Sequence, residues 1–201
     1  MVNVCILDYG SGNVKSVQNL LKYLKVKTIV SNKKENIKKS THIILPGVGA
    51  FGQSMKKLAK KVNIKALENE VIKKKKPFLG ICVGMQLLAD ESDEFGKHKG
   101  LGWIGGKVRK LRSKILPHIG WNDIKIKMKS NIFKNLHEKD FYFLNSYHFV
   151  LKNKNLVIAE SIYGHKFCSV VQKQNIIGVQ FHPEKSQGAG KKIIQNFLEL
   201  N

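Results

Sequence analysis

The sequence predicts an α/β fold in which helices flank a mostly parallel sheet, with an antiparallel strand region added in the C-terminal half. Over the first 90 residues, short apolar runs alternate with amphipathic segments, which is the pattern of strands joined by helical crossovers. From about residue 107 onward, apolar runs recur at hairpin-like spacing. A length of 201 residues with 42% hydrophobic residues and no linker-like segment predicts one domain, residues 1–201.

The N-terminal half is predicted to consist of strand–helix units. A strand over 2–8 ends in a glycine-rich turn, and the segment 14–24 then places its apolar residues on one helical face. The other expected elements are strands over 27–30 and 41–45, a glycine-rich turn over 46–52, helices over 53–61 and 64–75, and a strand ending near 80 before an amphipathic segment that runs to Ala89. Parallel strands of this kind are buried on both faces.

The C-terminal half changes character after a glycine-rich segment over 96–106. The expected elements are strands over 107–111, 124–128, 140–145, 156–161, 168–172 and 176–180, followed by a last helix over 190–200. These short intervals favour antiparallel pairing, because parallel strands need longer crossovers.

The formal net charge of +22 comes almost entirely from lysine, spread along the chain with little aromatic interleaving. A nucleic-acid partner is not expected from this pattern, since a lysine, asparagine and isoleucine bias is what an AT-rich genome produces. A solvated lysine surface is the simplest interpretation. The electrostatic field of this net charge could still attract an anionic partner surface or a phosphorylated substrate, and this alternative stays open.

The three cysteines are widely separated and lack metal-ligand spacing, so neither a disulfide framework nor a metal site is expected. The first residues meet Asp8 without a basic leader, and no apolar stretch reaches the length of a membrane span. We therefore expect a cytoplasmic protein with no membrane association. The turn over 10–13 lacks the third glycine of a dinucleotide fingerprint, and no cofactor is expected.

Cys82 is the strongest candidate for a catalytic residue. It follows an apolar strand and lies between Gly80 and Gly84, where a sharp strand-to-helix turn would expose a thiol beside free backbone N–H groups. A second candidate pair, His182 and Glu184, follows the apolar run 176–180. In a parallel sheet both segments reach the same carboxyl edge, so the sequence predicts a nucleophile, a base and a group that orients the base. The competing interpretation is that the cysteine packs in the core and the His-Pro pair forms a turn.

The turn Pro46-Gly47-Val48-Gly49 is a candidate oxyanion hole. Glycines on both sides of Val48 would allow the intervening peptide to rotate and to aim an N–H at a developing negative charge. The residues alone equally allow an ordinary thin loop against the sheet.

The specific motifs are DYGSGN at 8–13, PGVGAFG at 46–52, GICVGMQLL at 80–88, PHIGWN at 117–122, SY at 146–147 and FHPEKS at 181–186. Over essentially the full length, the chain resembles the class I, or triad, glutamine amidotransferases, and within them the glutaminase subunits of imidazole glycerol phosphate synthases. The first and fourth motifs point to these subunits. The resemblance implies a flavodoxin-like sheet.

The resemblance also implies roles for particular residues. Cys82 would attack the side-chain amide of glutamine, His182 would act as general base and then general acid, and Glu184 would orient the imidazole. The N–H groups of Val48 and Val83 would form the oxyanion hole. The α-amino and α-carboxylate groups of glutamine would be held by Gly49, Gln86, Glu94, Ser146 and Tyr147.

The resemblance further implies a heterodimer, in which ammonia passes to a (β/α)₈-barrel cyclase subunit of histidine biosynthesis. The partner surface would include the 8–13 turn and the 117–122 segment.

Asn145 departs from the family, which usually carries histidine before the Ser-Tyr pair. This departure keeps an alternative open, a paralogous glutaminase that supplies ammonia to a sugar amidotransferase of surface-glycan biosynthesis. A non-enzymatic module, a nucleic-acid-binding protein and other Cys-His hydrolases are further alternatives, and the intact Cys-His-Glu set favours the amidotransferase over them.

Overall fold

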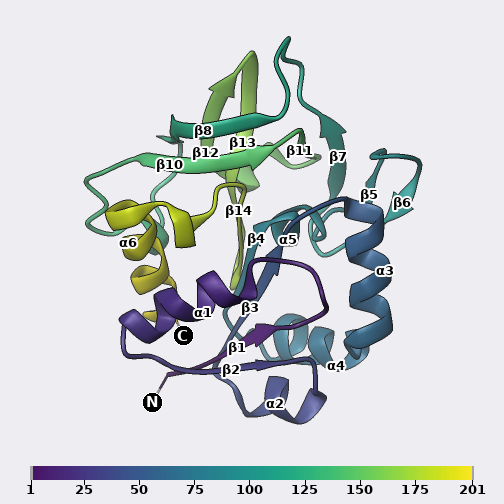
Figure 1. The fold of residues 1–201 in the computed structure, drawn as a ribbon, viewed down its shortest axis with the longest axis vertical. Helices are drawn as coiled ribbons and strands as arrows, with labels where there is room; N and C mark the ends of the chain where they lie inside the picture. Colours follow the sequence, from purple (N-terminus) through teal and green to yellow (C-terminus); the bar gives the residue numbers. More distant parts are fainter. Residues whose placement is uncertain (1, 201) are drawn as a thin grey trace.

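The computed structural model describes residues 2–200, and its centre is an eight-stranded mixed sheet of order β2-β1-β3-β4-β14-β13-β12-β9 (Figure 1). The parallel strands of this sheet are β1 (Asn3–Leu7), β2 (Lys27–Ser31), β3 (His42–Gly47), β4 (Phe78–Cys82) and β14 (Ile176–Val179). The antiparallel extension is formed by β13 (His165–Lys173), β12 (Val157–Tyr163) and β9 (Lys125–Ile126). The predicted fold class, mostly parallel with antiparallel strands in the C-terminal half, is confirmed.

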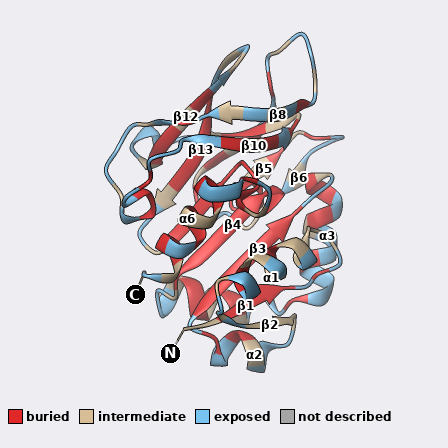
Figure 2. Ribbon diagram, turned by 60° about the vertical axis from the view of Figure 1, so that its left-hand side comes forward, coloured by how far each residue is buried: buried red, intermediate tan, exposed pale blue. Residues whose placement is uncertain are grey.

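Helices cover the parallel part of the sheet. They are α1 (Val14–Tyr23), α2 (Lys34–Lys39), α3 (Phe51–Lys61), α4 (Ile64–Glu68) with the π-helical turn η1 (Asn69–Lys73), α5 (Val83–Gln86) and α6 (Gln187–Leu198). The helices α1 and α6 lie on the nearer face in Figure 1, and α2 packs with α4. The strands β3, β4 and β14 are buried along their whole length and β1 from Val4 onward, as Figure 2 shows in red, whereas the edge strand β2 is only partly buried. The core therefore lies on both faces of β1, β3 and β4.

Two smaller sheets stand above the carboxyl ends of the parallel strands. One pairs β8 (His118–Asp123) with β10 (Asp140–Asn145), and the other has the order β11-β7-β5-β6, from β11 (Tyr147–Leu151), β7 (Gly106–Lys110), β5 (Glu91–Ser92) and β6 (His98–Lys99). Short 3₁₀ turns occur at η2 (Asn131–Phe133), η3 (Lys154–Leu156) and η4 (Pro183–Lys185). The loop over 111–117 rises above these strands in Figure 1.

The structure corrects several predicted elements. The helix α2 and the strands β5, β6, β8 and β11 are not among the elements that the sequence predicts, and the strand predicted over 124–128 is only the two-residue β9. The predicted helix after Cys82 ends at Gln86 rather than near Ala89. The carbonyl groups of residues 87–89 instead accept hydrogen bonds from the segment 101–104, which stops the helix there.

Candidate active site

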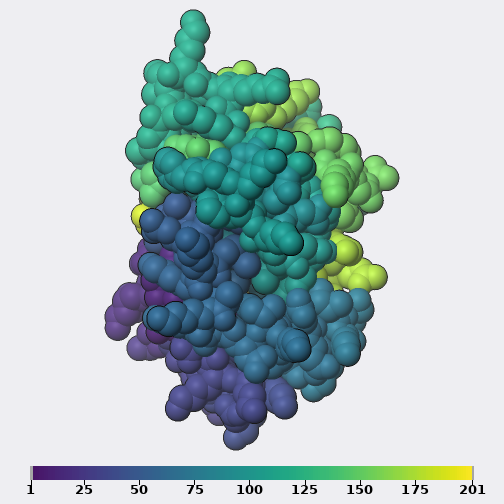
Figure 3. All heavy atoms as spheres, turned by 90° about the vertical axis from the view of Figure 1, so that its right-hand side faces the viewer, coloured from purple at the N-terminus to yellow at the C-terminus, as the bar shows by residue number. Residues whose placement is uncertain are grey.

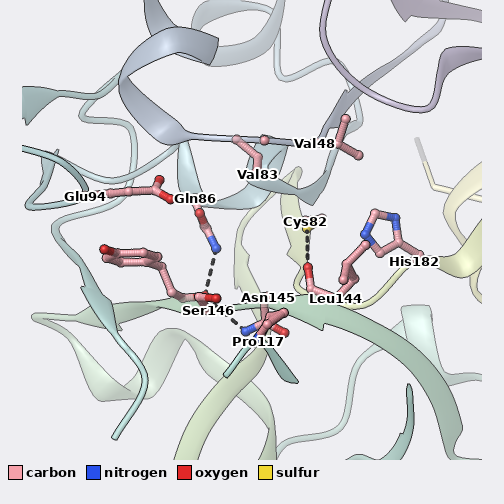
Figure 4. A pocket seen from close by; sticks show the side chains of 12 residues that line it. Val48, Cys82, Val83, Gln86, Glu94, Pro117, Leu144, Asn145, Ser146 and His182 are labelled. Carbon is pink, nitrogen blue, oxygen red and sulfur yellow. Dashed lines mark hydrogen bonds between the residues drawn. The ribbon is translucent and has the colours of Figure 1, made fainter. Parts of the chain in front are cut away.

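A pocket of about 190 Å³ lies at the carboxyl edge of β3 and β4. Its lining residues come from distant parts of the chain: Val48, Gly49, Cys82, Val83, Gln86, Glu94, Pro117, Leu144, Asn145, Ser146, Tyr147 and His182. Figure 4 shows Cys82 near the centre, with His182 on one side and Gln86 and Glu94 on the other. Every site residue expected from the sequence lines this pocket except Glu184, which contacts His182 from behind.

Cys82 occupies a strained turn between β4 and α5. Its φ of 54° and ψ of −112° lie in a region that residues other than glycine rarely adopt. Such a conformation costs on the order of 1–3 kcal/mol and persists where the surroundings hold it in place. Here the support is close packing at Gly84, where a Cβ atom would collide with the carbonyl oxygen of Leu45.

The Cys82 side chain is 3% exposed and has two polar neighbours. Its Sγ lies 3.8 Å from the carbonyl oxygen of Leu144, and the amide Nε2 of Gln180 donates to Sγ at 3.7 Å. Neither Leu144 nor Gln180 is among the site residues that the sequence predicts. Gln180 precedes His182 by two residues, and the alternation of side chains along an extended segment is the signal that places both on one side.

His182 is held on both its backbone and its ring. Its N–H donates to the carbonyl oxygen of Tyr142 at 2.9 Å, and its carbonyl accepts from Oγ of Ser186 at 2.6 Å. Ring atom Nδ1 lies 2.9 Å from Oε1 of Glu184, while Nε2 is buried without a hydrogen-bond partner. A carboxylate on Nδ1 fixes the orientation of the ring and leaves Nε2 to serve Cys82.

The charges around His182 favour its protonated form. Burial alone would lower the pKa of His182, but the adjacent Cys82 sulfur and the Glu184 carboxylate outweigh it and raise that pKa to about 10. A proton that leaves the Cys82 thiol is therefore retained on the imidazole. The arrangement can hold a thiolate–imidazolium pair, which is the reactive form of a cysteine nucleophile.

The candidate oxyanion loop is anchored on both sides of Val48. The hydroxyl of Tyr9 donates to the carbonyl oxygen of Pro46 at 2.9 Å, and Oγ of Ser11 donates to the carbonyl oxygen of Val48 at 2.7 Å. The peptide between Gly47 and Val48 lies between these two fixed carbonyls. The glycine-rich turn over 8–13 thus positions this loop, a contact that the sequence alone did not predict.

The expected glutamine-binding residues surround the other end of the pocket. Glu94 is 9% exposed and its Oε2 accepts from the N–H of Phe51 at 2.6 Å, while burial raises the pKa of its carboxyl. Gln86 donates through Nε2 to the carbonyl oxygen of Tyr147 and to Oε1 of Gln180, both at 3.0 Å. A buried carboxylate opposite a half-buried tyrosine suits an α-ammonium group.

Asn145 occupies the position at which the sequence departs from the family pattern. Its Nδ2 donates to the carbonyl oxygen of Tyr147 at 3.0 Å, and its Oδ1 is buried without a partner. The side chain therefore supports the loop that carries Ser146 and Tyr147 and still presents a free acceptor to the pocket region.

Within residues 2–200, no group of three His, Cys, Asp or Glu side chains is placed to hold a metal ion. Over the same residues, none of the helices has both the length and the apolar character that a membrane span requires.

Residues 5–200 match the family model "Glutamine amidotransferase class-I". The chain belongs to this family of enzymes. Within it, the chain belongs to the HisH subunits of imidazole glycerol phosphate synthase, since curated relatives with this name match over nearly the full length. The protein from Bdellovibrio bacteriovorus is 44% identical over 97% of this chain and 98% of its own. The protein from Chlorobium chlorochromatii is 43% identical over 98% of this chain and 100% of its own.

Solved structures share the fold at lower sequence identity. A structure described as "Crystal structure of glutamine amidotransferase" aligns with a TM-score of 0.78 at 20% identity, covering 98% of this chain and 97% of its own. A putative GMP synthase subunit from Thermoplasma acidophilum aligns with a TM-score of 0.73 at 20% identity, covering 98% and 92%. The predicted family and fold are confirmed by these matches.

Proposed function

We propose that this chain hydrolyses glutamine at Cys82 and delivers the ammonia to a cyclase subunit of imidazole glycerol phosphate synthase. The observation that carries the proposal is the strained Cys82 beside a His182 whose Nδ1 is bonded to Glu184. A glutaminase needs a thiolate, a proton carrier and an oriented base, and this pocket brings the three groups together.

The reaction proceeds in two halves. His182 accepts the thiol proton, the Cys82 sulfur attacks the amide carbon of glutamine, and the amide oxygen takes up negative charge. The N–H of Val83, next to the nucleophile, and that of Val48 stabilise this oxyanion, the latter after its peptide rotates. His182 then returns the proton to the leaving nitrogen, releasing ammonia and a γ-glutamyl thioester. Water, deprotonated by His182, attacks the thioester to give glutamate and the free thiol.

The other pocket residues hold the part of glutamine that does not react. The Glu94 carboxylate pairs with the α-ammonium group, and the Ser146–Tyr147 loop with Gln86 and Gly49 contacts the α-carboxylate. Gly49 has φ +89° and open space where a Cβ would stand, so the backbone there can approach the ligand.

The proposed partner is a (β/α)₈-barrel cyclase, and its docking surface surrounds the mouth of the pocket. Ile119 and Trp121 on β8 are 59% and 46% exposed, and Val48 at the pocket rim is 39% exposed. A second hollow, lined by the 8–13 turn, shares Val48 and Gly49 with the pocket. Exposed apolar side chains around a site are typical of a surface that binds another protein. A partner subunit that covered the mouth of the pocket would keep the released ammonia from being protonated in water.

Asn145 supports a second candidate, ammonia supply to a sugar amidotransferase, because it replaces the usual histidine in the glutamine loop. The names of the curated relatives favour the cyclase over this candidate.

The deciding experiment measures glutamate release by the purified chain alone, then with the cognate barrel subunit and its formimino ribonucleotide substrate. Strong stimulation together with imidazole glycerol phosphate formation is the expected result. Glutaminase activity that responds only to a sugar amidotransferase would replace the first proposal by the second, and no activity in either mixture would contradict both.

A further inference from the structure

A further hollow, of about 830 Å³ and distinct from the one lined by the 8–13 turn, lies beside the glutamine pocket and shares only Tyr147 with its lining. We call it the basic pocket, and its walls are formed by Asp93, Arg109, Lys110, Arg112, Tyr147, His148, Val150, Lys154, His165 and Lys166. Figure 1 shows β7 and β11, which carry half of these residues and pair with each other, in the upper right part of the molecule. On the side shown in Figure 3, teal atoms of the β5–β7 region lie beside green atoms of the following β11 region. None of the proposed catalytic steps uses this pocket.

The arginine distribution distinguishes this pocket from the general lysine surface. The 201-residue chain has 36 lysines and arginines, and only Arg109 and Arg112 are arginines. Both line the basic pocket. Arginine presents a planar fork of donors that matches the oxygens of a phosphate or carboxylate, which a lysine cannot reproduce. A composition bias toward lysine explains a positive surface but not the use of arginine at these two positions.

The charges of the pocket are strongly unbalanced. Five cationic side chains face one carboxylate, Asp93, and that carboxylate already forms an ion pair with Arg109. The pair fixes one edge of the guanidinium group and leaves its other donors free. Arg112, Lys110, Lys154 and Lys166 have no salt-bridge partner among residues 2–200. An anionic ligand would supply the missing negative charge.

His148 is the buried polar group at the base of this pocket. It lies directly opposite Arg109 across the β7–β11 pair, it is 7% exposed, and its Nδ1 has no hydrogen-bond partner. Its Nε2 lies 3.4 Å from Nε2 of His165, whose own Nδ1 contacts the carbonyl oxygen of Arg112 at 3.3 Å. Burial, His165 and nearby cations lower the pKa of His148 to about 4, so both its burial and its missing partner are costs to the fold. A bound anion would offset both.

We propose that the basic pocket is a binding site for a small phosphorylated molecule. The volume falls in the range of small-molecule sites, about 300–1,000 Å³. Two arginines, three lysines and two histidines converge on it from β7 and the loop that follows it, and from β11, η3 and β13. A hollow with donors on several sides suits a compact phosphate group better than the extended backbone of a nucleic acid, which would need a groove with aromatic stacking platforms. Tyr147 and the chain neighbours Asp93 and Glu94 connect this site to the glutamine pocket.

The test measures binding of inorganic diphosphate to the full chain by isothermal titration calorimetry at 150 mM salt. Inorganic phosphate, ribose 5-phosphate and a nucleoside diphosphate are compared with it, to separate recognition of a free phosphate from that of a phosphorylated sugar or nucleotide. The double variant Arg109→Gln/Arg112→Gln removes the two guanidinium groups and their positive charge. The matched control, Lys56→Gln/Lys60→Gln on exposed positions of α3, removes the same charge outside the pocket.

The expected result is saturable 1:1 binding of at least one phosphorylated probe, weakened at least about tenfold by the arginine variant and less than about twofold by the control. Equal weakening by both variants would show diffuse attraction and overturn the proposal. Absence of saturable binding, or binding of a single-stranded oligonucleotide alone, would overturn it as well. The measurement does not depend on glutaminase activity, and Cys82→Ala is expected to bind the probe as the wild type does.

Discussion

Two buried histidines of this protein have opposite electrostatic surroundings. His182 and His148 are 1% and 7% exposed, and each has one ring nitrogen without a hydrogen-bond partner. The pKa of His182 is raised to about 10, because the neighbouring Cys82 sulfur and the Glu184 carboxylate outweigh burial. The pKa of His148 is lowered to about 4, because burial, His165, Lys154 and Arg112 all act in the same direction.

The difference shows that burial does not decide what a histidine does. Desolvation opposes the charged form at both sites, and the sign of the neighbouring charges decides the outcome. An acid partner makes His182 a carrier of a proton, as thiol catalysis requires. Burial together with cationic neighbours keeps His148 neutral, and these neighbours leave a surplus of positive charge that an anion can balance.

The largest effect is expected from Cys82→Ala. The substitution removes the nucleophile, so glutamine hydrolysis should fall by about 10⁴-fold or more. It also removes the largest influence that raises the pKa of His182, which should then titrate at lower pH in an NMR titration of the ring protons.

The matching control uses the partner reaction. With the cognate cyclase and added ammonium salt, the Cys82→Ala complex should still form product, because only the ammonia source has been removed. Loss of the ammonium-driven reaction would instead indicate a folding or assembly defect, and retained glutaminase activity would rule out Cys82 as the nucleophile.

The second effect is expected from Glu184→Gln. Glutamine keeps the shape and a hydrogen bond but removes the negative charge, so the pKa of His182 should fall and its ring should be less firmly oriented. We expect a loss of roughly 10²–10⁴-fold in kcat/KM, by analogy with removal of the acid from other triads. The alkaline limb of the pH–rate profile, placed near pH 10 by His182 in the wild type, should move to lower pH. An unchanged alkaline limb would contradict the assigned role of Glu184.

The two histidine sites also differ in how far the sequence predicts them. Cys82 and His182 each follow an apolar strand, and the rule that sites form at the carboxyl edge of a parallel sheet brings them together. The basic pocket depends on pairing of β7 with β11 and on the return of β13, contacts between distant segments that no local pattern specifies. Helix α2 was not predicted for a local reason. Its sequence KENIKK has one buried apolar residue, Ile37, and so lacks the repeated apolar positions by which an amphipathic helix is predicted.

The third effect concerns stability in acid. His148 in the unfolded chain takes up a proton near pH 6.5, whereas in the folded chain it does so only near pH 4. Because the unfolded state binds the proton first, stability falls as the pH drops through this window, and the loss is complete below pH 4. At pH 5 this cost is about 2 kcal/mol relative to pH 7.5.

Urea unfolding of the wild type and of His148→Gln at both pH values measures that cost. The wild type should lose about 2 kcal/mol more than the variant between pH 7.5 and pH 5. Contributions from the histidines that do not contact His148 are common to both proteins and cancel in the difference. Equal losses would show that the surroundings of His148 do not suppress its protonation.

The smallest effect is expected from Arg112→Gln, and it tests the comparison most directly. Arg112 is the weakest of the groups that lower the pKa of His148, and its side chain is exposed, where water and salt screen its charge. Its removal should raise the pKa of His148 by roughly a few tenths of a unit. Glu184→Gln, which removes the negative charge beside His182, should lower the pKa of that histidine. Glu184→Gln and Arg112→Gln should therefore move the pKa values of their neighbouring histidines in opposite directions. NMR titration of both rings, with Lys56→Gln as a control for net charge, measures this. An unchanged or lowered pKa of His148 would mean that Arg112 does not help to keep this histidine neutral, and the electrostatic contrast between the two sites would then not hold.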